Sequence, residues 1–226
     1  MHLPALFQFL DGLAENNNRP WFIHNKPSFD ILNAEFIELV ESVGKRVAKF
    51  DKEIGPLDAK KSVFRIYRDV RFAKDKSPYK THFGAVIGAR NMSDKTRPIH
   101  YFHIDHTGTL LVAAGIYKPD AGTLKRLRQY IADNPGTVTR LLANKAFAAT
   151  YGGFADEERL TRPPKGFDAE QPHIEIIKNR HFFCETTINL KKMKKSQDLA
   201  DLIADRFKEA APLVAWARKA AKAADA

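Results

Sequence analysis

The sequence has one cysteine, Cys184, among 226 residues. A single thiol cannot form an internal disulfide, which agrees with a reducing compartment. No apolar run approaches the length that a bilayer span needs. The first residues lack the Lys/Arg-rich start of a signal peptide and carry Asp11 within their apolar repeat. The sequence therefore predicts a soluble, cytoplasmic protein with no membrane partner.

Several catalytic signatures are also absent. No serine lies in a G-x-S-x-G elbow, and the GAVIGAR run at 84–90 does not open the helix that a nucleotide-binding loop requires. His100 and His103 would point to opposite faces of a strand, which disfavours shared metal ligation. His103 and Asp105 would share a face, either as a surface pair or as a base and its orienting group. We therefore predict no metal and no cofactor.

Positive charge is concentrated in one stretch, KKSVFRIYRDVRFAKDKSPYKTH, at 60–82. The whole chain has 37 Lys and Arg against 27 Asp and Glu, a formal net charge of +10. The stretch has eight cations and two carboxylates, so its net charge of +6 is more than half of that total. Two carboxylates cannot neutralise eight cations, and the stretch is therefore predicted to bind an anion.

The apolar pattern changes period along the chain. Helical spacing predicts helices over 3–13 and 27–50, separated by a turn-rich connector, NNNRPWFIHNKPSF. Alternation of period two then predicts strands over 63–67, 82–89, 99–105 and 109–117, with a last strand over 181–190. Consecutive strands without intervening helices indicate an antiparallel meander.

Helical signals return in the second half of the chain. Helices are expected from Pro119 to Asn134, over 138–142 and over 174–177, and a final helix is expected to start after Ser196. Pro212 is expected to kink or divide that helix, and the end from about 219 to 226 is expected to fray. The sequence thus predicts one α+β domain over 1–226, in which N-terminal, central and C-terminal helices pack a mainly antiparallel β-meander sheet.

The basic stretch contains the candidate site. Arg65 and Tyr67 would project from the strand face opposite Phe64 and Ile66. The predicted ligand-binding residues are Arg65, Arg68, Asp69, Arg71, Asp75 and Lys76. In that set the guanidiniums would bind an anion in forked geometry, the ammonium would act as a mobile point charge, and the carboxylates would orient them.

Two further residues, Tyr79 and His82, are the predicted proton-transfer groups. Nearby cations would lower the pKa of Tyr79. The same charges fit a different interpretation, in which an Arg–Asp network pins a long loop to the sheet and leaves nothing for a ligand.

The stretch also resembles a known family. Arg65-x-x-Arg68-Asp69-x-Arg71-Phe72-x-x-Asp75-Lys76-x-x-Tyr79 is similar to the signature R-x-x-R-D-x-R-F-x-x-[DN]-K-x-x-Y of a family of bacterial and fungal proteins classed as a domain of unknown function. NNNRPWF with the NKP that follows, the segment at 115–124, and RPPKGFD with Pro172 resemble that family too. The resemblance covers nearly the whole chain. It implies a bacterial cytoplasmic protein and no particular activity.

Three functions stay open on these grounds. The first is binding of a phosphate- or carboxylate-bearing small molecule in an Arg/Lys-lined pocket, with hydrolase or transferase chemistry conceivable. The second is a nucleic-acid-binding module that uses the basic segments 60–80 and 191–195, with Tyr67 or Trp21 stacking on bases. The third is a structural or adaptor protein. The residues leave open whether any reaction is catalysed and what the oligomeric state is.

Overall fold

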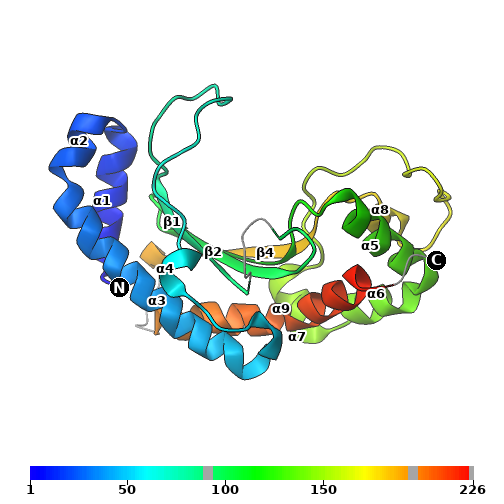
Figure 1. Ribbon diagram of the computed structural model, residues 1–226. Helices are drawn as coiled ribbons and strands as arrows, with labels where there is room; N and C mark the ends of the chain where they lie inside the picture. Colours follow the sequence, from blue (N-terminus) through cyan, green and yellow to red (C-terminus); the bar gives the residue numbers. More distant parts are fainter. Residues whose placement is uncertain (89–93, 193–197, 224–226) are drawn as a thin grey trace. The chain divides into compact units, whose positions relative to one another are not determined.

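Four strands form one antiparallel sheet in a computed structural model of the chain, which describes residues 1–88, 94–192 and 198–223 (Figure 1). The strands are β1 (His82–Ile87), β2 (Ile99–Asp105), β3 (Thr109–Ile116) and β4 (Phe182–Asn189). Their order in the sheet is β1-β2-β3-β4, the same as in the sequence. The predicted antiparallel meander and the α+β class are therefore confirmed.

Helices precede, interrupt and follow these strands. Their bounds are α1 Leu3–Glu15, α2 Arg19–His24, α3 Lys26–Phe50, α4 Ala59–Ser62, α5 Ala121–Asp133, α6 Pro135–Leu142, α7 Lys145–Tyr151, α8 Ile174–Ile177 and α9 Leu199–Ala221, with short 3₁₀ turns at Lys52–Ile54 and Leu190–Lys192. None of the described helices is both long and apolar enough to cross a bilayer.

Contacts between Cα atoms divide the chain into two compact units. Unit 1 comprises Met1–Ile87, Tyr101–Val112 and Thr187–Ala204. Unit 2 comprises Gly88–His100, Ala113–Thr186 and Asp205–Ala226. The division falls inside β2, β3, β4 and α9. The two units form one domain if they unfold together, so the single domain over 1–226 stays a prediction.

The core of unit 1 lies between α3 and one face of β1 and β2. Phe36 of α3 is fully buried, and its ring centroid lies 5.5 Å from both Phe83 of β1 and Phe102 of β2. Strand residues alternate in direction, so Phe83 and Phe102 belong to the covered face and their sequence neighbours to the opposite one. The apolar stripe of α3 therefore covers one side of these strands.

The predicted connector between the first two helices is wrong in part, because it contains the helix α2. The Asn18 side chain accepts a hydrogen bond from the Trp21 amide at 3.0 Å, and Pro20 lies in the first turn, where its missing N–H costs nothing. Phe22 of this helix is buried, and its ring stacks on Tyr79 with centroids 4.1 Å apart. A helix too short to show a period therefore anchors the base of the basic stretch.

The core of unit 2 is built around Trp216 of α9. Its ring centroid lies 5.4 Å from Phe154 and 6.2 Å from both Tyr130 and Phe182. Its indole N–H donates to the Thr137 hydroxyl at 3.2 Å, so the polar atom of this buried ring is satisfied.

One glycine is required where β3 approaches β4. Gly115 has a φ of 131°, and a Cβ placed on it would lie 2.4 Å from the Phe182 carbonyl oxygen. Because neither the backbone conformation nor the space admits a side chain, the two strands pack closely only with glycine here.

Helix α9 differs from its prediction. It runs from Leu199 to Ala221 with Pro212 inside it, so Pro212 does not divide the helix, and the kink that was the other expectation stays a prediction. Ser196, the predicted cap, lies outside the described residues. The Asp198 carboxylate accepts hydrogen bonds from the backbone amides of Ala200 at 2.8 Å and Asp201 at 3.3 Å. Asp198 is therefore the N-cap of this helix.

Candidate functional site

The basic stretch forms an arm that rises from β1 (Figure 1). We call residues 63–81 the signature arm. Val63 pairs with Ala85 and Tyr67 with Tyr79 in isolated antiparallel bridges. Farther out, the Arg68 amide donates to the Pro78 carbonyl at 2.9 Å, so the two sides of the arm run together as in a hairpin. The predicted strand at 63–67 is thus one side of the arm and not a full strand of the sheet.

Alternation along the arm agrees with the sequence. Ile66 is buried, whereas Arg65 and Tyr67 are exposed, and 53% of Tyr67 is accessible. The Asn17 side chain clamps the return strand, because it donates to the Tyr79 carbonyl and accepts from the Tyr79 amide, each at 3.0 Å. These contacts fix the base of the arm to unit 1.

Two ion pairs hold the outer part of the arm. Arg68 pairs with Asp75, and Arg71 pairs with Asp69 at 2.7 Å. The hydrogen bond from Arg71 lowers the pKa of Asp69 to about 2. The Ser77 hydroxyl, and then Arg68, hold the pKa of Asp75 far below its ordinary value. Two predicted guanidiniums are therefore engaged by different carboxylates of the arm.

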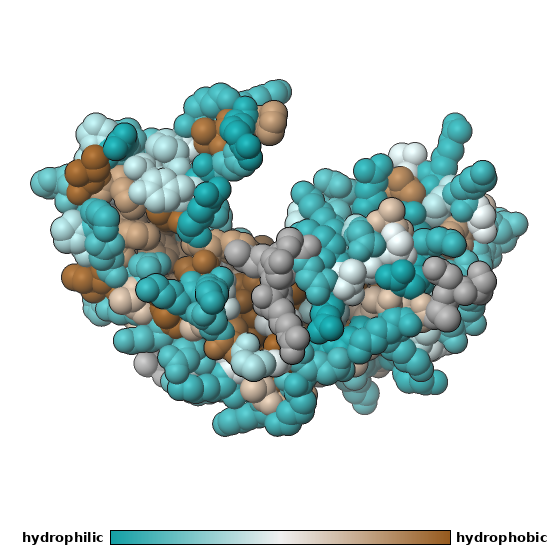
Figure 2. Space-filling model, viewed as in Figure 1, coloured by the Kyte–Doolittle hydropathy of each residue, from teal (hydrophilic) through white to brown (hydrophobic). Residues whose placement is uncertain are grey.

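The remaining predicted cations are placed differently. The Lys76 ammonium donates to the Val70 carbonyl at 2.9 Å and so braces the turn. The side chains of Arg65 and Lys74 are exposed and form no hydrogen bond or ion pair with any described residue. Figure 2 shows the arm as a mostly hydrophilic segment with apolar residues among the polar ones. Net positive charge thus extends along a narrow projecting segment.

The end of the arm presents an aromatic ring to solvent. Phe72 is 95% exposed, and the Arg71 guanidinium carbon lies 5.9 Å from its ring centroid. Together with Tyr67 it gives the arm two exposed aromatic rings separated by cations. Phe72 belongs to the family signature, but its exposure does not follow from the sequence, because an aromatic ring next to an arginine can equally well pack into a core.

The side chain of Tyr79 is buried and packs against Phe22. Only 3% of it is exposed, and burial raises the pKa of its phenol. The expected lowering by cations is therefore wrong, since desolvation outweighs the one nearby charge, that of Arg19, which acts in that direction. A part for Tyr79 in proton transfer stays a prediction.

His82 lies in a cluster on the face of β1 and β2 that α3 does not cover. Its ring centroid is 4.9 Å from that of His103, and the Tyr101 hydroxyl is 2.9 Å from Nδ1 of His103. A Cβ on Gly84 would come within 3.2 Å of both Tyr101 and His103, so the glycine leaves room for them. The i, i+2 spacing of Tyr101 and His103 is the sequence signal that could have predicted this cluster.

Desolvation controls ionisation in this cluster. It lowers the pKa of His82 to about 4, lowers that of His103, and raises that of Tyr101 to about 12. Both imidazoles are therefore neutral at pH 7 and can accept a proton or a hydrogen bond. The cluster adds flat, uncharged rings beside the base of the arm.

Comparison with known proteins places the chain in a family. A search of curated proteins and a search of solved structures found no match. A family model described as "Conserved hypothetical protein (DUF2461)" matches residues 5–216, which is nearly the whole chain. The chain therefore belongs to this family of conserved hypothetical proteins.

Proposed function

We propose that this protein binds single-stranded nucleic acid through the signature arm. The observation that carries the proposal is the ring of Phe72, which is 95% exposed between the cations Arg71 and Lys74. Every nucleobase offers a face on which an aromatic ring stacks, and every nucleotide brings a phosphate for a neighbouring cation. The arm presents both kinds of group, in alternation, on one exposed segment.

The geometry of the arm favours an extended ligand over a compact one. Small-molecule sites enclose most of their ligand, whereas the exposed cations of the arm stand in solvent. Arg68 and Arg71 are also each paired with a carboxylate, which lowers the affinity that they can contribute for a single small anion. Residues 63–81 have six cations against two carboxylates, and a polyanion can meet this net charge of +4 along its length.

The proposal depends on the arm and not on the second basic segment. The ammonium of Lys191 lies 3.4 Å from Asp11, and residues 193–195 lie outside the described part of the chain. Attachment to an anionic lipid surface is the competing outcome. We favour nucleic acid because one exposed phenyl ring buries too little apolar area for stable membrane anchoring, whereas arginine forks fit phosphate oxygens.

The experiment is fluorescence anisotropy of labelled single-stranded oligonucleotides, DNA and RNA, titrated with the whole chain over a range of salt concentrations. If about four arm cations contact phosphates, log K should fall with log salt with a slope of about −3. Phe72→Ala should weaken binding about tenfold with the slope unchanged, because it removes a stacking contact and no charge.

Ile31→Ala is the matched control, since Ile31 is an apolar side chain of α3 that is 63% exposed. It should bind like the wild type. Weak binding at every salt concentration, an equal loss in both variants, or tighter binding to anionic phospholipid vesicles than to oligonucleotides would each refute the proposal.

A further inference from the structure

Unit 2 has a cavity of about 470 Å³, widely open to solvent, that the candidate site does not use. This volume lies in the range of small-molecule sites. Its polar lining comes from Lys118, Arg128, Glu158, Arg180 and His181, and two leucines and a proline complete the wall. Four of these five polar residues can carry positive charge, so the lining is rich in hydrogen-bond donors.

His181 provides a buried donor at this cavity. Only 4% of the residue is exposed, and its Nδ1 accepts the Lys118 backbone N–H at 3.1 Å. Because Nδ1 is an acceptor, the neutral imidazole carries its proton on Nε2. Nε2 is buried and forms no hydrogen bond, although Oε2 of Glu158 lies 3.4 Å away. A buried N–H without a partner costs free energy that a bound acceptor would recover.

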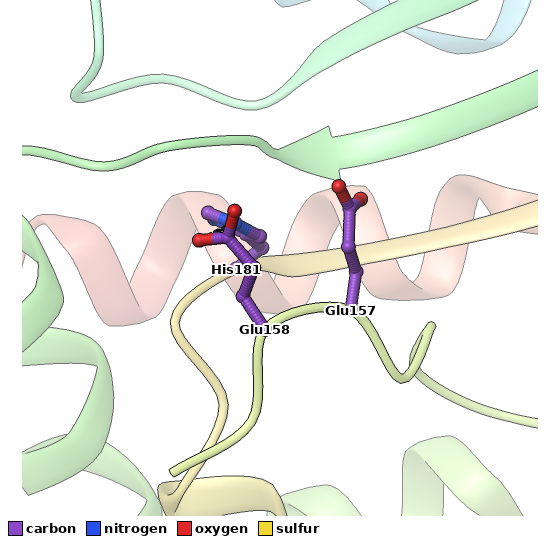
Figure 3. Close-up of side chains that lie close together, drawn as sticks. All are labelled: Glu157, Glu158 and His181. Carbon is purple, nitrogen blue, oxygen red and sulfur yellow. Dashed lines mark ion pairs between the residues drawn. The ribbon is translucent and has the colours of Figure 1, made fainter.

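The neighbouring acids suggest a metal site at first sight. Glu157, Glu158 and His181 bring one ligand atom each within 4.8 Å of one another, and Figure 3 shows the Glu158 carboxylate close to the imidazole. A metal at Nε2 would need the lone pair that the proton occupies, and the other tautomer would lose the hydrogen bond from Lys118. Glu157 also accepts a hydrogen bond from the Tyr117 hydroxyl at 3.2 Å. The imidazole is therefore set up to donate and not to ligate.

Two arginines add uncompensated charge to the same cavity. The Nη2 of Arg128 donates to the Asn179 carbonyl at 3.0 Å, while its Nε is buried without a partner. Neither Arg128 nor Arg180 has an ion-pair partner among the described residues. Desolvation, and then repulsion from Arg180, lower the pKa of Arg128. Two guanidiniums close enough to repel each other, neither of them ion-paired with a carboxylate of the described residues, favour an external anion.

The backbone at the cavity wall is also unusual. Lys118 and Glu158 both have positive φ, at 49° and 53°. Residues other than glycine adopt this conformation at some cost, and such residues concentrate at ligand sites. In this case the strained backbone of Lys118 directs its amide N–H at His181 and so fixes the imidazole tautomer.

We propose that this cavity binds a small molecule through a phosphate or carboxylate group that accepts hydrogen bonds from Arg128, Arg180 and Nε2 of His181. The Glu158 carboxylate beside Nε2 would accept a hydrogen bond from a hydroxyl or amino group next to that anion. The preferred ligand is therefore a small hydroxylated or aminated oxyanion. This site lies within unit 2 and is independent of the arm in unit 1.

The test is isothermal titration of the whole chain with inorganic phosphate, glycerol 3-phosphate and malate, at constant ionic strength. At least one of the two organic anions should bind more tightly than inorganic phosphate, because only they carry an alcohol hydroxyl beside the anionic group, where Glu158 can accept its hydrogen bond. Arg180→Gln should weaken that binding at least tenfold, as expected for the loss of a charge-assisted hydrogen bond. The side chain of Arg180 is exposed and forms no hydrogen bond or ion pair with a described residue, so the variant should unfold at about the wild-type temperature.

Arg140→Gln is the matched control, because it removes the same charge from an exposed position of α6. It should leave affinity unchanged, as should Phe72→Ala in the arm. In ¹⁵N NMR spectra the Nε–H signals of wild-type arginines should include one that shifts with ligand. The proposal fails if none of the three anions binds below about 10 mM, or if Arg180→Gln and Arg140→Gln lose affinity equally.

Discussion

Desolvation sets the charge of the side chains around His82. The ring of His82 lies against that of His103, and the Lys80 ammonium also disfavours its protonation. A cation at this position would have lost most of its water without gaining a strong counter-ion. The two imidazoles beside the arm are therefore uncharged at neutral pH, whereas the arm itself is cationic.

This burial makes stability depend on pH. The pKa of His82 is about 4 in the folded chain and 6.5 when unperturbed, so the unfolded state binds more protons between these values. The free energy of unfolding should therefore fall as the pH drops from 6.5 to 4, by about 2 kcal/mol. Urea unfolding at a series of pH values measures this change.

His82→Gln should make that profile shallower, because it removes one of the two desolvated imidazoles and leaves His103 to titrate. His24→Gln, at an exposed position of α2, should keep the wild-type profile. Equal profiles for wild type and His82→Gln would mean that another group causes the loss.

At the scale of elements, the contacts between the arm and the core that the described residues show lie at the base of the arm. Ile66 and Tyr79 are buried at the base, whereas the exposed outer residues contact mainly one another, through Arg68 with Asp75 and Arg71 with Asp69. Exposed ion pairs contribute little to stability. The outer arm should therefore be dispensable for folding.

Replacing residues 69–77 with Asn-Gly tests this separation. The dipeptide favours the tight turn that joins two antiparallel segments, and the bridge between Tyr67 and Tyr79 stays available to close it. We expect the thermal midpoint to stay within about 3 °C of the wild type, since the removed segment buries little apolar surface. A midpoint lower by 10 °C or more would show that the outer arm belongs to the core.

The elements that the sequence predicts best are those in which an apolar period repeats over seven or more residues. The strands at 99–105 and 109–117 are found within one residue of their predicted bounds, and the helix at 27–50 within one residue. Helix α2 was missed because Asn18 and Pro20 are typical of turns as well as of helix starts.

In the arm, the amino-acid composition predicts the net positive charge. The pairing of Arg68 with Asp75 depends on which residues face each other across the hairpin, and composition carries no information on that.

At the scale of the whole molecule, the two units share elements. Strands β2, β3 and β4 and helix α9 each contribute residues to both. Unfolding of one unit would break part of the hydrogen-bonded ladder in strands that also belong to the other unit, and so would expose apolar side chains in both. We therefore expect the units to unfold in one cooperative transition, as the prediction of a single domain requires.

The two tryptophans permit a direct measurement. Trp21 lies in unit 1 and Trp216 in unit 2, so Trp216→Phe and Trp21→Phe each leave a fluorophore in one unit. In each variant, the fluorescence transition in urea should coincide with that of circular dichroism. Two separate transitions within either variant would show that the units are independent domains.

The charge of the whole chain is compatible with a polyanionic partner, and the arm carries +4 of the total of +10. The measurement that tests the proposed function most directly compares wild type and the Asn-Gly variant of the arm in anisotropy titrations with one single-stranded oligonucleotide at low salt. Binding through the arm predicts at least a hundredfold loss of affinity in a protein that stays folded. Equal affinity of the two proteins would contradict nucleic-acid binding by the arm.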